Sequence, residues 1–289
     1  MAEKSCGDIV LLDITDGMPQ GKALDIVQSA PVVGFDSGLI GTNDYQDTTD
    51  SDVVVITSGA GRKPGMSRDE LLKINGAIVS EVARNVASRS PDGIIIVVTN
   101  PVDAMTYLAL RVSGFLPNRV LGLSGVLDGA RFSSFIAAEL GMPASEISAL
   151  VLGGHGQNMV VLPRLSTVGG RPLTEMLPQE TITKLVERTI NGGAEVVGLL
   201  RVSSASYAPS AAIARMIEAI ILDKKEILPC AVYLEGEYGI KDTVVGVPVK
   251  LGKNGIEEII ELKLIDEEKK ALKSSAEVTR QLIDTMKLG

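Results

Sequence analysis

Over the first half of the chain, short β-branched apolar runs alternate with longer stretches that have helical spacing. The apolar runs lie at residues 9–13, 53–57, 94–99, 119–122 and 149–152. Continuous runs of this length are typical of strands that are buried on both faces of a parallel sheet. The stretches with helical spacing lie at residues 68–87, 103–113 and 129–140. This alternation predicts a doubly wound α/β fold, in which ligands bind at the carboxyl ends of the strands.

The second half has a different pattern, which predicts an α+β domain. Helical spacing covers residues 180–200 and 210–223, and residues 224–233 and 243–251 have the pattern of antiparallel strands. A turn signal follows at residues 252–255, and residues 265–288 form an amphipathic helical pattern. We place the domain boundary near Ala144, just after Gly141-Met-Pro143. The domains are therefore expected at residues 1–143 and 144–289.

Charge and composition narrow the class of partner. The 289 residues include 28 basic and 36 acidic side chains, a net charge of −8, and only 3% are aromatic. An acidic chain without basic clusters or stacking aromatics gives no sign of nucleic-acid binding. Small molecules and further copies of the chain are the expected partners.

The two cysteines, Cys6 and Cys230, are too few for a disulfide framework and lack the spacing of metal ligands. We expect free thiols in a reducing compartment and no metal site. The apolar runs are much shorter than the roughly 20 residues of a membrane helix. Because the first residues resemble neither a secretory signal nor a transit peptide, we expect a cytoplasmic protein without membrane contact.

The single histidine, His155, lies between glycines in Gly153-Gly-His-Gly156, directly after a predicted strand. A lone histidine is often structural. Here the glycines allow a ligand to approach the main chain, and an imidazole in such a loop suits general acid–base chemistry near neutral pH. We take His155 as the candidate base.

Such a base needs an acid to orient it, and Asp128 in Gly125-Val-Leu-Asp-Gly-Ala-Arg131 is the best candidate. A buried carboxylate on one imidazole nitrogen would fix the tautomer and stabilise the protonated ring. The alternative is a helix N-cap, a position where Asp is favoured.

Three arginines, Arg62, Arg68 and Arg131, lie near predicted strand ends. Surface arginines are mostly solvated. Together with Asp128 and His155, however, they indicate a site for a small polycarboxylate, because the planar guanidinium binds a carboxylate through two hydrogen bonds.

Asp13 ends the first predicted strand and has two interpretations. It is either a turn or cap residue, or the acid that accepts the adenosine ribose hydroxyls in a dinucleotide-binding domain. In the second case its charge would repel a 2′-phosphate and favour NAD over NADP.

Four motifs carry a family resemblance: Arg62-Lys-Pro-Gly-Met-Ser-Arg68, Thr99-Asn-Pro-Val-Asp103, Val126-Leu-Asp-Gly-Ala-Arg131 and Gly153-Gly-His-Gly156. With them, the chain resembles the lactate/malate dehydrogenase family, and most closely its lactate-dehydrogenase-like bacterial malate dehydrogenases. The resemblance covers essentially the whole chain. It implies a Rossmann-type domain that binds NAD, a C-terminal domain that binds malate or oxaloacetate, and a homodimer or homotetramer.

The resemblance also implies residue roles. His155 would exchange the hydroxyl proton of malate, and Asp128 would orient it. Arg131 would bind the carboxylate next to the reacting carbon, and Arg68 would polarise the carbonyl. Arg62 would bind the second carboxylate, at a position where lactate enzymes of this family usually have Gln.

Further implied roles concern the cofactor. Asn100 would contact both the substrate and the nicotinamide end of NAD, and Asp13 would hold the ribose. Gly59 and Ala60 would lie beside the cofactor. Asn75 matches another cofactor contact, although it also fits an ordinary exposed helical Asn.

Family members begin with a strand and a Gly-x-Gly-x-x-Gly turn, whereas this chain starts near the end of the helix that follows. We therefore expect the sheet to lack its first, central strand, which would leave strand edges unpaired. A truncated gene model explains this most simply. The alternatives are a non-catalytic member of the family, acting as a dicarboxylate binder or assembly subunit, and a lactate dehydrogenase, which Arg62 disfavours.

Overall fold

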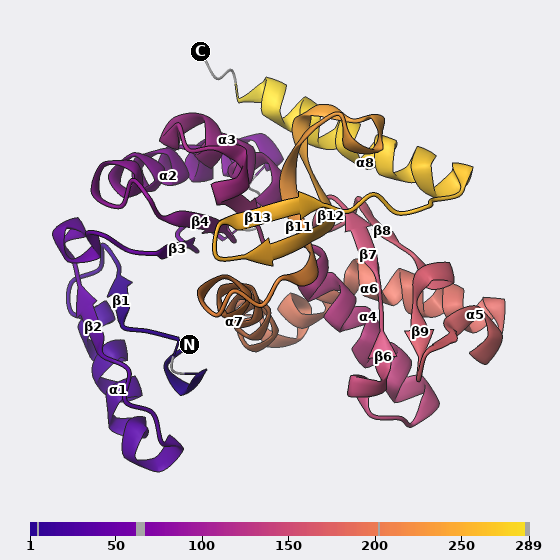
Figure 1. Ribbon diagram of the computed structural model, residues 1–289, viewed down its shortest axis with the longest axis horizontal. Coiled ribbons are helices and arrows are strands. Elements are labelled where there is room, and N and C mark those ends of the chain that lie inside the picture. Colours follow the sequence, from indigo (N-terminus) through magenta and orange to yellow (C-terminus); the bar gives the residue numbers. More distant parts are fainter. Residues whose placement is uncertain (5, 62–66, 202, 287–289) are drawn as a thin grey trace.

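A large mixed sheet forms the centre of the molecule. The computed structural model describes residues 1–4, 6–61, 67–201 and 203–286. Within these residues an eight-stranded sheet has the order β3-β4-β5-β11-β12-β7-β8, and β13 pairs with β12 (Figure 1). Its strands are β3 (Val53–Ile56), β4 (Ile94–Val97), β5 (Val120–Gly122), β7 (Val151–Gly153), β8 (Met159–Val161), β11 (Glu226–Glu235), β12 (Lys241–Gly252) and β13 (Gly255–Ile259).

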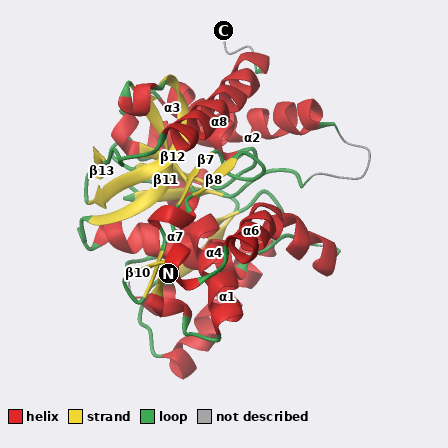
Figure 2. Ribbon diagram, turned by 90° about the vertical axis from the view of Figure 1, so that its right-hand side faces the viewer, coloured by secondary structure: helices red, strands yellow, loops and turns green. Residues whose placement is uncertain are grey.

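Helices cover both faces of this sheet. The helices α2 (Arg68–Arg89), α3 (Val102–Ser113) and α8 (Asp266–Thr285) lie on one side, and α4 (Gly125–Leu140), α6 (Gln179–Leu200) and α7 (Tyr207–Ile221) lie on the other (Figure 1 and Figure 2). Strand β4 is buried along its whole length, as its continuous apolar run predicts. The α/β fold class is confirmed.

The parallel strands fall into two sets. Strands β3, β4 and β5 pair in parallel inside the large sheet. Strands β1 (Ile9–Leu12) and β2 (Leu39–Thr42) pair with each other in parallel, and in the described chain they form a separate sheet (Figure 1). Helix α1 (Met18–Val33) packs against this pair. This is the break that the sequence predicts, and it leaves β1 only half-buried.

The second half follows the predicted pattern closely. The hairpin of β11 and β12 is antiparallel, and the turn signal at residues 252–255 lies between β12 and β13. Besides short 3-10 helices, the remaining described elements are a small antiparallel sheet and a short helix: β6 (Ile147–Ser148), β9 (Thr167–Val168), β10 (Arg171–Pro172) and α5 (Leu173–Met176).

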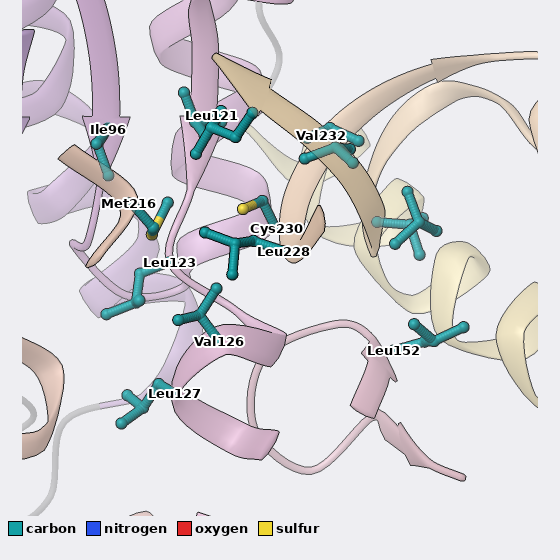
Figure 3. Packing of buried hydrophobic residues seen from close by; sticks show 14 of the residues in the cluster. Ile96, Leu121, Leu123, Val126, Leu127, Leu152, Met216, Leu228, Cys230 and Val232 are labelled. Carbon is teal, nitrogen blue, oxygen red and sulfur yellow. The ribbon is translucent and has the colours of Figure 1, made fainter. Parts of the chain in front are cut away.

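The two halves share one sheet and one core, which the sequence pattern does not reveal. Strand β11 pairs with β5 through Ala231 and Gly122. The largest buried cluster contains Leu121 and Val126 from the first half together with Met216 and residues of β11 from the second (Figure 3). The catalytic candidates from both halves are therefore attached to the same framework.

Both cysteines are free, as the composition predicts, and the structure shows that both are buried. Burial raises the pKa of Cys230 to about 12, so this thiol stays protonated and unreactive at neutral pH. Among the helices in the described part of the chain, we find none that combines the length and apolarity needed to cross a membrane.

Gly246 allows β12 to approach β7 next to the loop that carries His155. It pairs with Gly153, and a Cβ atom at position 246 would overlap the Gly153 carbonyl oxygen and lie 2.5 Å from Ser124 Oγ. We expect Gly246→Ala to destabilise the fold by about 1–3 kcal/mol, because two main chains must separate. Urea unfolding measures this change.

The matched control is Gly198→Ala in α6. A Cβ atom at this position would have no neighbour within 4 Å among the described atoms, and alanine favours the helix by roughly 0.5–1 kcal/mol. If both variants unfold at the wild-type urea concentration, the close approach at Gly246 is not needed.

Candidate active site

Asp128 lies inside the first turn of α4. The helix begins at Gly125, four residues before the predicted start, and Ser124 occupies its N-cap position. The N-cap interpretation of Asp128 is therefore wrong. The Asp128 side chain is 1% exposed, so burial of its charge requires partners.

His155 and Arg131 are these partners. The His155 Nδ1 atom lies 2.8 Å from Asp128 Oδ2, and Arg131 Nη1 donates a hydrogen bond of 2.9 Å to Asp128 Oδ1. Strand β7 ends at Gly153 and leads directly into the His155 loop. The structure thus brings together three residues that lie up to 27 positions apart in the sequence. Since Asp128 occupies Nδ1, Nε2 is the imidazole nitrogen left for a substrate.

The surroundings of His155 favour its protonated form. Burial of the ring lowers its pKa, but the charge and hydrogen bond of Asp128, together with the charge of Asp103, outweigh burial and raise the pKa above its usual range. The charge of Arg131 opposes this rise. An imidazole with a raised pKa can carry a proton at neutral pH and release it to a reacting oxygen.

Helix α6 passes close to the Arg131 side chain at two glycines. A Cβ atom at Gly192 would lie 3.3 Å from Arg131 Cδ, and one at Gly193 would lie 3.6 Å from Arg131 Nη2. The absence of side chains at these two positions leaves room for the guanidinium beside Asp128. Only one of its five N–H groups is needed for Asp128, so the others can bind a carboxylate.

A second group of predicted residues gathers at the carboxyl ends of β3 and β4. The Asn75 side chain accepts the Ala60 N–H at 2.7 Å and donates to the Asn100 carbonyl oxygen at 2.7 Å. Asn75 is 1% exposed, so it is not an exposed helical Asn. A Cβ atom at Gly59 would lie 3.1 Å from Asn75 Oδ1. Asn75 therefore fixes the main chain of both loops, and the Asn100 residue itself is exposed.

Asp13 directly follows β1 in the separate two-stranded sheet. Its Oδ1 atom accepts the Thr15 N–H at 2.8 Å, and this main-chain hydrogen bond holds the pKa of Asp13 below its usual value. The carboxylate is therefore ionised at neutral pH. This hydrogen bond is the one that the turn interpretation of Asp13 predicts.

Two of the three predicted arginines cannot be placed. Arg62 lies outside the described residues, and so does the side chain of Arg68. The main chain of Arg68 begins α2, behind a capping box in which Ser67 and Glu70 hydrogen-bond reciprocally.

Sequence reasoning missed two residues that hold the His155 loop. Asp103 Oδ2 accepts the His155 main-chain N–H at 2.9 Å, and Ser275 Oγ accepts the Gly154 N–H at 2.7 Å. Asp103 is the last residue of the Thr99–Asp103 motif, so the sequence draws attention to the residue but does not indicate that it binds the His155 main chain. Ser275 lies in α8, 120 residues from His155, and no local pattern marks it.

Comparison with known families finds matches over nearly the whole chain. Residues 1–122 match the NAD-binding domain of lactate/malate dehydrogenases, and residues 125–288 match the alpha/beta C-terminal domain of the same family. The chain belongs to the lactate/malate dehydrogenase family. The resemblance expected from the four motifs is confirmed.

Individual members of the lactate/malate dehydrogenase family are similar over nearly their full length. The malate dehydrogenase of Methanosarcina mazei is 54% identical, over 100% of this chain and 94% of that protein. The solved malate dehydrogenase of Salinibacter ruber is 50% identical with a TM-score of 0.94, over 99% of this chain and 91% of that chain. A lactate dehydrogenase of Cryptosporidium parvum, solved with lactic acid and nicotinamide adenine dinucleotide, is 41% identical with a TM-score of 0.95, over 100% and 92%.

The residues of this family member fit NAD, the cofactor expected from the sequence and supported by the matched domain. The ionised Asp13 lies at the carboxyl end of a parallel strand, where it can accept ribose hydroxyls. The loops at Gly59, Ala60 and Asn100 are held together at neighbouring strand ends.

Proposed function

We propose that this chain interconverts malate and oxaloacetate, with NAD as the hydride carrier. The contact of 2.8 Å between Asp128 and His155 carries the proposal, because it gives the chain an oriented proton carrier. Full-length relatives named malate dehydrogenase, at 52–54% identity, support the choice of substrate. They disfavour the two alternatives, a lactate dehydrogenase and a non-catalytic dicarboxylate binder.

His155 moves the proton in this reaction. During malate oxidation its Nε2 atom takes the proton of the C2 hydroxyl, and Asp128 stabilises the imidazolium that results. During oxaloacetate reduction the same nitrogen returns the proton to the carbonyl oxygen. The cofactor, when bound, accepts or supplies the hydride at C2.

Arginines bind the two carboxylates and the reacting oxygen. Arg131, already held beside Asp128, binds the carboxylate next to C2 through its remaining N–H groups. Arg68 polarises the C2 carbonyl, and Arg62 binds the second carboxylate of the dicarboxylate. Asn100 contacts the substrate and the nicotinamide end of the cofactor.

The remaining cofactor contacts come from two strand ends, those of β1 and β3. Asp13 accepts the ribose hydroxyls, and its charge favours NAD over NADP. Gly59 and Ala60 lie beside the cofactor, in a loop that Asn75 fixes through the Ala60 N–H.

We also propose a homodimer or homotetramer in the cytoplasm. Large apolar side chains are exposed on two helices: Leu24 is 59% and Val32 88% exposed on α1, and Leu199 is 76% exposed on α6. Such surfaces favour association with further copies of the chain. The boundary between a cofactor domain at 1–143 and a substrate domain at 144–289 stays a prediction.

The variant Arg62→Gln tests the substrate. It removes the cation for the second carboxylate, and a hydrogen bond to a charged group contributes about 1.5–3 kcal/mol. We expect kcat/KM for oxaloacetate to fall about 10- to 100-fold, and kcat/KM for pyruvate to stay the same or rise. Both are measured by NADH oxidation.

The control is Arg215→Gln, which removes an exposed arginine of α7 that pairs with Glu226 at the start of β11. It should leave both substrates unaffected. Equal losses on oxaloacetate and pyruvate in Arg62→Gln would contradict the proposed specificity.

A further inference from the structure

A second buried carboxylate, Asp103, lies beside His155. It is the second residue of α3 and is 6% exposed. Its Oδ2 atom accepts the His155 main-chain N–H at 2.9 Å, and a Cβ atom at Gly154 would lie 3.2 Å from the same oxygen. Its Oδ1 atom is buried and has no hydrogen-bond partner among the described residues. A buried carboxylate that keeps an unpaired oxygen is costly, so a compensating role is expected.

Asp103 acts together with Ser275 on the loop that follows β7. Ser275 Oγ accepts the Gly154 N–H at 2.7 Å and donates to the Asn158 carbonyl oxygen at 2.6 Å. Two successive main-chain N–H groups, those of Gly154 and His155, are thus held from two different helices, α8 and α3. The loop is fixed independently of the Asp128 contact to the imidazole ring.

We propose that Asp103 is the positioning residue of the active site, which fixes the main chain under His155 and, when it is ionised, adds a second negative charge beside the imidazole. The effect of Asp103 on catalysis rests on the proposed function. Its role in fixing the His155 loop rests only on the contacts that Asp103 makes.

Asp103 also affects His155 through its charge, in addition to its hydrogen bond to the main chain. Burial raises the pKa of Asp103 to about 7, although the charge of His155 and its N–H hydrogen bond act in the opposite direction. Among the described residues, the charges that shift the pKa of His155 are those of Asp128 and Arg131 on α4 and of Asp103 on α3. The charges that shift the pKa of Asp103 are those of His155 and Asp128. Because the charge of each group shifts the pKa of the other, we expect Asp103 and His155 to titrate as a coupled pair.

The decisive experiment is an NMR titration of the imidazole, which is unambiguous because the chain has one histidine. In Asp103→Asn the amide oxygen can still accept the His155 N–H, but the negative charge is gone. We expect the pKa of His155 to fall by about 1 pH unit and its coupled titration to become a single step. Oxaloacetate reduction needs protonated His155, so the alkaline limb of kcat/KM moves to lower pH by the same amount.

Two further variants separate the effect of fixing the His155 loop from the effect of the Asp103 charge. Asp103→Ala removes the acceptor as well, and we expect kcat at the pH optimum to fall about 10- to 100-fold, with most of the loss restored in Asp103→Asn. Ser275→Ala loosens the same loop without a change in charge, so it should lower kcat and leave the alkaline limb in place. If Asp103→Ala does not fold, the Asp103→Asn titration alone decides.

An unchanged His155 titration in Asp103→Asn overturns the inference, and so does full activity in Asp103→Ala. The proposed function fails separately, if the wild-type chain does not reduce oxaloacetate with NADH. The imidazole titration requires no turnover, so it decides the role of Asp103 in either case.

Discussion

Replacement of His155 by Asn is expected to slow oxaloacetate reduction by about 10²- to 10⁴-fold, the contribution of a positioned general acid. The chain contains no other histidine, so no second imidazole can take over the proton. The His155 side chain is 12% exposed, and within the described residues its ring hydrogen-bonds to Asp128, so the fold should tolerate the similar size of Asn. Steady-state NADH oxidation across a pH series measures the loss.

The control for this variant is cofactor binding. Asp13, Gly59 and Asn100 are untouched by the substitution, so quenching of NADH fluorescence should give the wild-type dissociation constant. Turnover near the wild-type rate would exclude His155 as the proton carrier, and loss of NADH binding would show that the variant disturbs more than the imidazole.

Replacement of Asp128 by Ala is expected to lower the free energy of unfolding by about 3–5 kcal/mol. The Arg131 and Asp128 side chains are only 15% and 1% exposed, so removal of the carboxylate leaves a guanidinium in a nearly dry environment without its partner. This loss is a large part of the total stability of a typical domain. Urea unfolding at pH 7 measures it.

The surface pair of Arg188 and Glu195 provides the comparison. These side chains are 51% and 37% exposed, so water screens the pair, and Glu195→Ala should lower the free energy of unfolding far less than Asp128→Ala does. If Glu195→Ala and Asp128→Ala lower the free energy of unfolding by similar amounts, the burial of Asp128 and Arg131 does not make their pair more important for stability than an exposed pair.

An element of the fold can be predicted from the sequence when the residues that determine it are neighbours in the chain. Strand β4 was predicted because four consecutive buried residues give an unbroken apolar run. Helix α1 was not, because Gly21 and Pro31 interrupt its pattern and many of its apolar side chains are exposed. The junction of β5 and β11 depends on small residues at one contact: a Cβ atom at Gly122 would lie 3.1 Å from Ala231 Cβ, and no spacing rule links residues 109 positions apart.

In the candidate site, too, some residues could be predicted from the sequence and others could not. His155, Asp128 and Arg131 were recognisable from residue type and position at strand ends, and the structure places them in contact. The N-cap interpretation of Asp128 failed because residues 125–127, although apolar, are the first turn of α4 and not part of a strand. Asp103 was overlooked because its contact is with a main-chain N–H group, which has no signature in the sequence.

The junction between β5 and β11 also limits how the protein moves. Strands from both halves belong to one hydrogen-bonded sheet, and Gly246 of β12 joins the strand that leads to His155. A hinge between the halves would have to break this sheet and split the core cluster that contains Leu121 and Met216. Asp128 and His155, the proposed catalytic pair, are both attached to this framework, so we expect their separation to stay the same when a substrate binds.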